Sequence, residues 1–230
     1  MACSIYVEVF IRADLDELWR RTQQPDLHRR WDLRFTDIDH LPHTTDGPRR
    51  FRYALRPLPG VTVTGLGVTL GERHRPDGSS TSALRFSSND PLSPIRAGSG
   101  FWRYIPTSGG IRFLTGYGYR PGWGRTVDRV FRPVMSWATA WSFDRLRLWL
   151  ETGRTPEHLL RQALVELLTR AAVTWTALLV LRLPIALTVT AAAILLPPLP
   201  GTPAARRCLR RPPGGRAVRA PATLALLEQP

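Results

Sequence analysis

The segment GRTVDRVFRPVMSWATAWSFDRLRLWLETG, Gly124–Gly153, decides the fold of this chain. It is long enough for about seven or eight helical turns, and apolar residues recur on one side at helical spacing, so we predict one long amphipathic helix. Pro133 lacks an amide hydrogen, which predicts a bend in the first third. Gly153 is expected to end the helix in a left-handed conformation. The predicted apolar face holds Val127, Val130, Phe131, Val134, Ala138, Trp141, Leu148 and Trp149, with Arg125, Asp128, Arg129, Arg132, Ser136, Thr139, Arg147 and Glu151 opposite.

The chain before this helix is predicted to form an antiparallel sheet. Ser4–Ala13 alternates like a strand, and Asp14 is the expected N-cap of a short helix with Glu17 three residues on. Pro25 starts a second short helix. Between Leu33 and Tyr119, turns rich in Pro, Gly, Asp and Asn separate six extended runs. Connections this short exclude parallel crossovers, so we predict a meander.

Arginines that alternate with large apolar residues assign the faces of these strands. Neighbouring residues of a strand point to opposite faces of the sheet. If the arginines face water, the aromatic residues between them form the inner face, together with a few hydroxyl groups. Glycines in Val61–Leu70 leave the faces of that run unassigned. The predicted inner face holds Phe51, Tyr53, Leu84, Phe86, Trp102, Tyr104, Phe113, Thr115 and Tyr117.

The charge of the chain is uneven. The formal net charge of the chain is +14. Residues 167–230 hold 8 of the 32 arginines but only 1 of the 18 acidic residues, so this last part of the chain carries half of the net positive charge. Clustered arginine beside an apolar segment favours an anionic membrane surface as the partner. Nucleic acid is not expected, because acidic residues are mixed among the arginines of the first 166 residues.

Neither metal sites nor a disulfide framework are indicated. The two cysteines, Cys3 and Cys208, lie at opposite ends of the chain, and no metal-ligand spacing occurs. The first thirty residues lack the apolar core of a secretion signal, so the body of the protein is expected in the cytoplasm.

The order of the predicted elements, and the residues at the beginning of the chain, resemble a known superfamily. One antiparallel sheet, interrupted by two short helices after its first strand and closed by a long helix, is the order of the helix-grip fold, an α+β architecture. Ile5–Ala13, the helix start at Asp14–Trp19, Thr22–Asp26 and Trp31 resemble the opening of the START-like superfamily (SRPBCC), in its polyketide cyclase/dehydrase and lipid-transport branch. The resemblance covers roughly residues 1–153.

This resemblance implies a curved sheet wrapped around the long helix, with an apolar cavity that binds a lipid, a polyketide or another hydrophobic molecule. No cofactor is expected. The alternative is that the aromatic side chains meet and fill a solid core. The residues expected to line the cavity are Phe51, Tyr53, Phe86, Trp102, Tyr104, Phe113, Tyr117, Val134, Trp137 and Trp141.

Catalysis is the second hypothesis, since the superfamily includes aromatases and cyclases. It has no universal catalytic motif, so no residue is assigned as catalytic. Residues with suitable acid–base chemistry are His40, His43, His74, Asp32 and Tyr104, but a solvated loop position is the expected role of the histidines. The G-x-S-x-G motif, which holds the nucleophilic serine of α/β-hydrolases, does not occur in the sequence.

The chain after Gly153 is predicted to seek a membrane. An amphipathic helix begins near Pro156 and runs into Ala171–Leu196, 26 residues with the single charge of Arg182. The folded domain and the basic C-terminus are both expected on the cytoplasmic side, but a single span would place them on opposite sides of the membrane. A hairpin broken at Arg182–Pro184 keeps both on one side and is therefore the better fit. Packing of this segment on the domain or on a second subunit is the alternative.

We therefore expect three parts and one function. Residues 1–153 form the helix-grip domain, residues 154–199 an amphipathic helix leading into a membrane-associated apolar segment, and residues 200–230 a basic tail without fixed structure. The expected function is binding or transfer of a hydrophobic small molecule by a cytoplasmic domain attached to the cell membrane through residues 171–196. An enzyme of the cyclase or aromatase type is the alternative.

Overall fold

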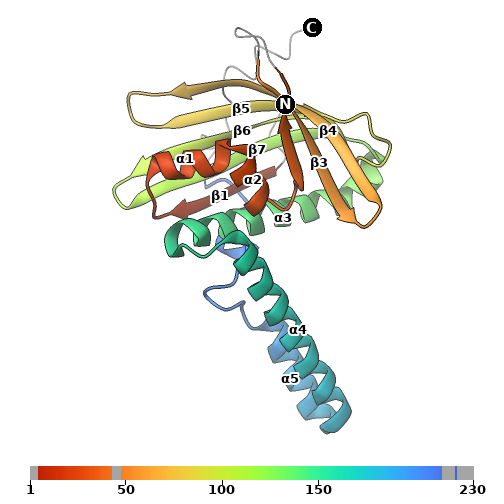
Figure 1. The fold of residues 1–230 in the computed structure, drawn as a ribbon. Helices are drawn as coiled ribbons and strands as arrows, with labels where there is room; N and C mark the ends of the chain where they lie inside the picture. The colour runs from red at the N-terminus through yellow and green to blue at the C-terminus, as the bar shows by residue number, and fades with distance from the viewer. Residues whose placement is uncertain (1–4, 43–47, 214–220, 222–230) are drawn as a thin grey trace.

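Seven strands form a single antiparallel sheet in the computed structural model, which describes residues 5–42, 48–213 and 221. The strand order is β1-β7-β6-β5-β4-β3-β2, so every neighbour except the β1–β7 pair is also a neighbour in sequence. The meander of six strands predicted between Leu33 and Tyr119 is confirmed (Figure 1). The strands are β1 (Ile5–Ile11), β2 (Asp37–His40), β3 (Arg50–Leu58), β4 (Val61–His74), β5 (Ser80–Ser87), β6 (Ile95–Thr107) and β7 (Gly110–Pro121).

Two short helices follow β1, as their capping residues predict. Helix α1 (Leu15–Gln23) begins after Asp14, whose carboxylate accepts hydrogen bonds from the amides of Asp16 and Glu17 at 2.8 and 3.3 Å. Helix α2 (Pro25–Trp31) starts with proline, whose missing amide hydrogen would be unpaired in a first turn anyway. Both helices close one end of the space under the curved sheet.

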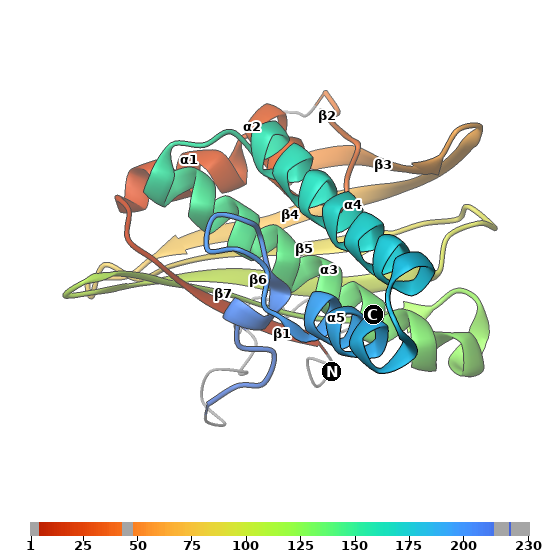
Figure 2. The ribbon, with the colours of Figure 1, turned by 90° about the horizontal axis from the view of Figure 1, so that it is seen from below.

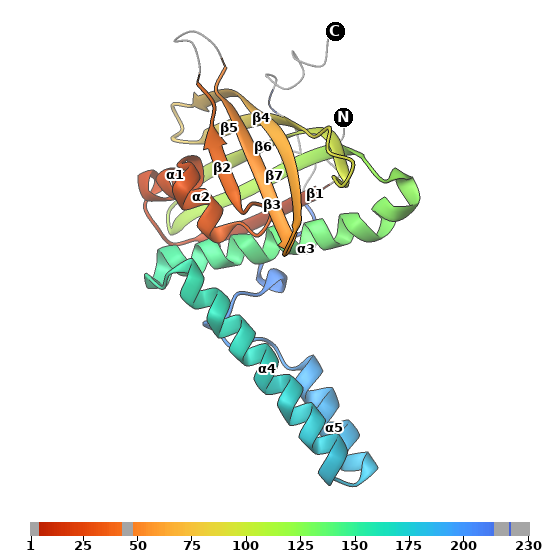
Figure 3. The same ribbon diagram turned by 45° about the vertical axis from the view of Figure 1, so that its right-hand side comes forward.

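Helix α3 (Gly124–Thr152) crosses beneath the sheet, and the sheet curls over it (Figure 3). It continues without interruption through Pro133 and ends at Gly153, which has a φ of 72° in the left-handed region. Strands β1 and β7 pack most closely against α3 and supply much of the core. This sheet, with a long helix held in its concave face, is the helix-grip fold that the order of elements predicted.

The predicted apolar face of α3 is wrong for three of its four residues in the first half of the helix, while the fourth, Phe131, packs against the core. Val127, Val130 and Val134 are 44%, 71% and 53% exposed, whereas Asp128 is buried. Asp128 faces the sheet because the Tyr119 hydroxyl donates to its carboxylate at 2.7 Å and Arg132 pairs with it. In the second half both sides of α3 are buried, since other segments cover the side that faces away from the sheet.

The chain after α3 forms a helical hairpin that projects away from the sheet (Figure 3), and Figure 2 shows its two helices from below. Helix α4 (Pro156–Val180) starts at the N-cap Thr155, and helix α5 (Leu183–Leu195) returns alongside it. The break at Leu181 and Arg182 confirms the predicted interruption before Pro184. The Arg145 side chain fixes the corner, because its Nε and Nη2 donate to the Pro156 carbonyl at 2.9 and 2.6 Å.

Residues 198–209, which we call the strap, run back from the hairpin onto the domain. The tail was expected to lack structure, and for these residues that prediction is wrong. The 3₁₀ helix η1 (Ala205–Arg207) packs on α3, and Leu209 exchanges two backbone hydrogen bonds of 2.9 Å with Glu8 at the edge of β1. Thr202–Ala205 and Cys208 are buried. Residues 214–220 and 222–230 of the predicted tail lie outside the described residues.

Candidate functional site

A cavity of about 150 Å³ lies between the inner face of the sheet and the first half of α3. Strand alternation positions its walls, because β6 and β7 pair Trp102 with Thr115 and Gly100 with Tyr117 and thereby send the larger side chains inward. A Cβ atom on Gly100 would lie 2.6 Å from that of Tyr117, so glycine is required there for the strands to keep this spacing. The lining is mainly apolar and includes Phe35, Phe51, Tyr53, Leu55, Val63, Leu84, Phe86, Ile95, Phe101, Trp102, Tyr117, Phe131 and Met135.

Five of the ten side chains predicted to line a cavity are placed in this one: Phe51, Tyr53, Phe86, Trp102 and Tyr117. These five side chains therefore lie on the inner face of the sheet, as the alternation within their strands predicts. The other two sheet residues of that set, Tyr104 and Phe113, also point inward but are fully buried in the core beside the cavity. The Tyr104 hydroxyl is bonded to Thr22 at 2.7 Å, and the Phe113 ring stacks on Phe143 with centroids 4.6 Å apart.

The three helix residues of the predicted set lie outside the cavity. Val134 and Trp137 are 53% and 47% exposed, and Trp137 and Trp141 line a separate depression between α3 and the hairpin. The wall that α3 contributes to the cavity consists of Phe131 and Met135 instead. Phe131 is on the apolar face predicted for α3 but not among the residues predicted to line the cavity, whereas Met135, one helical turn further on, is in neither set.

An ion pair that sequence reasoning missed forms the polar end of the cavity. Arg34 lines the cavity and donates from Nε and Nη2 to the two carboxylate oxygens of Asp32, at 2.9 and 2.6 Å. The Asp32 carboxylate is fully buried and also contacts Nε2 of His28 at 3.1 Å. A signal existed in the Asp-Leu-Arg sequence after α2, because the side chain of an aspartate in a turn commonly bonds to the residue two positions on, and the Arg34 amide donates to Oδ1 of Asp32 at 3.0 Å.

The environment fixes the charges of this group. Burial opposes ionisation of Asp32, yet the charge and hydrogen bonds of Arg34 hold the pKa of Asp32 well below its usual range. Burial likewise opposes the charge of Arg34, but Asp32 raises the Arg34 pKa. Burial lowers the pKa of His28 despite its contact with Asp32, so the imidazole is neutral at pH 7. The cavity therefore ends in a neutralised ion pair with a neutral imidazole beside it.

Two tyrosines add neutral hydroxyl groups to the lining. Burial raises the pKa of Tyr53 to about 12, and burial also raises that of Tyr117. The Tyr117 hydroxyl lies 2.9 Å from Oγ1 of Thr139, and its ring lies 5.5 Å from the Arg34 guanidinium carbon. The cavity can thus enclose an apolar body and offer hydrogen bonds to one polar end.

The residues considered for acid–base catalysis do not meet in one place. His40 is exposed on β2, and His74 is bonded to Ser80 at 2.8 Å and stacks near Trp19, while His43 lies outside the described residues. Asp32 is occupied by Arg34. Within residues 5–42, 48–213 and 221, no group of three or more His, Cys, Asp or Glu side chains is arranged to hold a metal ion.

Comparisons with known proteins give one sequence relative and several structures of similar fold. No family model matches the chain. The "Uncharacterized membrane protein YndG" of Bacillus subtilis (strain 168) is 45% identical over 166 residues, which are 70% of this chain and 62% of that protein. The chain therefore spans less than two thirds of the length of this relative.

Similar solved structures have low sequence identity. Human StAR-related lipid transfer protein 5 has a TM-score of 0.47 and 15% identity, with 61% of this chain and 73% of that chain covered. The di-domain ARO/CYC StfQ from the steffimycin biosynthetic pathway has a TM-score of 0.47 and 15% identity, with 64% and 49% covered. The STAR-related lipid transfer protein from Xanthomonas axonopodis has a TM-score of 0.44 and 20% identity, with 63% and 84% covered. The fold assignment itself stands on the strand order and the position of α3.

Proposed function

We propose that the protein binds a hydrophobic small molecule with one polar end in the cavity under its sheet, while the α4–α5 hairpin holds the domain at a membrane. The observation that carries the proposal is an apolar cavity that ends in the buried Asp32–Arg34 pair. Apolar walls with a few convergent polar groups are typical of small-molecule sites. A solid core would leave no such space, and it would not need a cation at its end.

The size of the cavity restricts the ligand. Sites for drug-sized molecules usually hold roughly 300–1,000 Å³, whereas this cavity holds about 150 Å³. A dry engineered cavity of about that volume in another protein accommodates benzene. The enclosed part of the ligand is therefore a single ring or a short branched chain, and any longer portion projects through the opening. A carbonyl or carboxylate at the enclosed end would accept hydrogen bonds from Arg34.

Binding rather than turnover is favoured by the state of the polar groups. General acid–base catalysis needs a group whose pKa lies near the working pH. Asp32 is held ionised by Arg34, while burial raises the pKa of the lining hydroxyls of Tyr53 and Tyr117 away from neutrality. Burial keeps His28 uncharged and in contact with Asp32. These groups can orient a ligand through hydrogen bonds without exchanging a proton with it.

Membrane attachment is supported by the surface of the hairpin. Helix α4 is long and apolar enough to cross a membrane by length and composition, and almost all of its most apolar portion is exposed. Large exposed side chains cover both helices, among them Trp175, Leu179, Ile185 and Ile194. Exposed apolar surface of this extent is unusual for a protein in water. The Bacillus subtilis relative is named a membrane protein, which agrees with this proposal.

The hairpin enters and leaves the membrane on one side in this proposal. Helix α5 has 13 residues, roughly 20 Å at 1.5 Å per residue, which is shorter than a hydrocarbon core of about 30 Å. Arg170 of α4 donates to the carbonyl of Ala193 in the last turn of α5 and to those of Leu196 and Pro197 just after it, so it ties the end of α5 to α4. The strap then returns to the domain. The domain and the strap therefore lie on the same side, which we assign to the cytoplasm.

Ligand binding is tested with the full chain purified in a mild detergent. Native mass spectrometry and organic extraction should find an apolar molecule in stoichiometric amount. Leu84→Trp, which adds an indole to the cavity wall, should lower its occupancy at least ten-fold, whereas Leu92→Trp, at an exposed leucine outside the cavity, should not. Equal occupancy in the two variants, or an empty wild-type protein that also takes up no apolar fluorescent probe, would contradict the proposal.

Membrane attachment is tested by flotation with phosphatidylcholine vesicles. Leu179 in α4 and Leu58 in β3 are similarly exposed, at 68% and 65%, and only the first lies on the hairpin. An arginine in the hydrocarbon core costs roughly 2.5–3.5 kcal/mol, so Leu179→Arg should lower partitioning about 100-fold. Leu58→Arg should leave it unchanged. If both variants float like the wild-type protein, the hairpin is not what holds the chain to the vesicle.

A further inference from the structure

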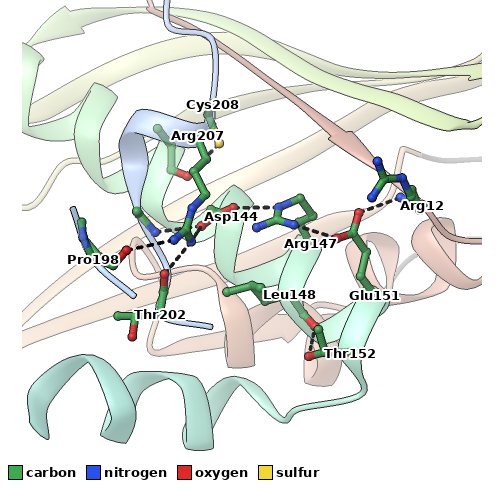
Figure 4. Close-up of polar contacts among 12 residues, drawn as sticks. Arg12, Asp144, Arg147, Leu148, Glu151, Thr152, Pro198, Thr202, Arg207 and Cys208 are labelled. Carbon is green, nitrogen blue, oxygen red and sulfur yellow. Dashed lines mark hydrogen bonds and ion pairs between the residues drawn. The ribbon is translucent and has the colours of Figure 1, made fainter. Parts of the chain in front are cut away.

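An open groove of about 730 Å³ lies at the root of the hairpin, away from the cavity under the sheet. The end of β1, the last turns of α3 and the beginning of the strap form its walls. One side is apolar, with Phe10, Pro198 and Leu199. The other side carries guanidinium groups, among them those of Arg12 and Arg206. Figure 4 shows Arg12, Arg147 and Arg207 on these three elements, with Asp144 and Glu151 between them.

Two of the four arginines in the groove are committed to internal contacts. Arg207 donates to Asp144 at 3.0 Å and to the carbonyls of Thr202 and Leu199 at 2.6 and 2.8 Å. Arg147 bridges Asp144 and Glu151 at 2.8 and 2.7 Å. Arg207 thereby holds the strap on α3, while Arg147 fixes the two carboxylates of α3 beside it (Figure 4).

The other two arginines are available to a ligand. Arg12 and Arg206 are exposed, and within the part of the chain that the structure describes neither guanidinium has an ion pair or a hydrogen bond. The backbone amide of Arg12 donates to Glu151 at 2.9 Å, so its main chain is fixed while its side chain is free. Four guanidinium groups face only two carboxylates, Asp144 and Glu151, in and beneath this groove. The groove thus carries an excess of two positive charges.

The position of the groove indicates where its ligand comes from. It includes Pro197–Pro200, the segment through which the chain leaves α5 and re-enters the domain. When the apolar part of the hairpin is in the hydrocarbon core, this segment lies at the depth of the lipid head groups. Arginine binds phosphate oxygens through paired N–H donors, and the apolar side of the groove suits the glycerol end of an acyl chain.

We propose that this groove binds the phosphate head group of an anionic phospholipid, with Arg12 and Arg206 as its ligands. The proposal rests on the membrane attachment proposed above. It adds to that function a preference among lipids, because the hairpin alone would enter a zwitterionic bilayer as readily as an anionic one. A cation near an anionic surface contributes roughly a five-fold gain in binding, so the two arginines together should contribute about 25-fold.

The test is co-flotation of the full chain with phosphatidylcholine vesicles, with and without phosphatidylglycerol. Phosphatidylglycerol should strengthen the binding of the wild-type protein, and Arg12→Gln/Arg206→Gln should reduce that gain about 25-fold without changing binding to phosphatidylcholine alone. The matched control is Arg52→Gln/Arg73→Gln, which removes two exposed arginines of β3 and β4 and should keep the gain. Far-ultraviolet circular dichroism checks that both double variants are folded.

Each other outcome overturns the proposal in a distinguishable way. Flotation with both vesicle types to the same extent would leave the hairpin attachment standing and refute the head-group site. An equal loss of the gain in the two double variants would mean that total charge, not this groove, attracts the lipid. No gain with phosphatidylglycerol, together with binding of inorganic phosphate that is lost in Arg12→Gln/Arg206→Gln, would identify a free-phosphate site instead. Failure to float with either vesicle would refute the attachment and this site with it.

Discussion

Replacing Asp144 by asparagine should release the strap from α3. The Asp144 carboxylate is fully buried and accepts three hydrogen bonds, from Nε of Arg147 at 2.8 Å, Nη1 of Arg207 at 3.0 Å and the amide of Ala204 at 2.8 Å. Breaking a buried ion pair by removing one partner costs about 3–5 kcal/mol. Arg147 keeps Glu151 and Arg207 keeps backbone carbonyls, so the lower end, about 3 kcal/mol, is expected.

Cys208 reports directly on this release. It is 6% exposed, its thiol donates to the carbonyl of Ala140 at 3.2 Å, and burial raises the pKa of the thiol. Each of these slows reaction with a thiol reagent while the strap is closed. If opening of the strap becomes about 3 kcal/mol easier, the labelling rate should rise roughly 100-fold. The measurement is the rate of reaction with a chromogenic disulfide, in a Cys3→Ser background so that one thiol is counted.

A matched variant separates this effect from a general loss of charge. Asp39→Asn removes an exposed carboxylate on β2 and should leave the labelling rate unchanged. Arg207→Gln, which leaves Asp144 two of its three donors, should give an intermediate rate. If Asp144→Asn labels no faster than Asp39→Asn, the buried carboxylate does not hold the strap, and the reasoning from the ion-pair network is refuted.

Three further predictions concern the polar end of the cavity and the hairpin. Asp32→Asn should lower the free energy of unfolding in urea by about 3–5 kcal/mol because Arg34 stays buried without its partner, and Arg34→Met in the same chain should recover part of that loss. Burial lowers the pKa of His28 in the folded state, so the unfolded state takes up more protons as the pH falls below about 6.5. The free energy of unfolding of the wild-type protein should then fall by up to about 1.4 kcal/mol per pH unit. The exposed control His40→Gln should show the same fall, and His28→Gln a smaller one. Arg170→Ala leaves three carbonyls at the end of α5 without this donor, so hydrogen exchange of the last turn of α5 should become about ten-fold faster, with no change in the strands of the sheet.

The fold was predictable because its signals are local. The N-cap Asp14, the turn sequences between strands and the terminating Gly153 each act within a few residues, and the structure has the expected element at each of them. Alternation within strands then fixed which aromatic side chains point inward, including Trp102 and Tyr117. These inferences need no knowledge of what packs against the strand from a distance.

The face of α3 could not be read in the same way, because distant segments decide what is buried. The apolar face was chosen as if only the sheet covered the helix. In the structure the strap covers the opposite side of the second half, so Asp144 is buried although its neighbours Arg147 and Glu151 read as a solvated face. In the first half, Tyr119 draws Asp128 toward the sheet. Polar residues buried by specific partners remove the contrast on which periodicity depends.

The division of α3 into two halves also separates the two proposed activities. Its first half supplies Phe131 and Met135 to the cavity, and its second half supplies Asp144 and Arg145 to the strap and the root of the hairpin. Perturbations at sites without shared contacts add, whereas sites within one network couple. Since no lining residue of the cavity also lines the groove, loss of lipid preference should not by itself empty the cavity.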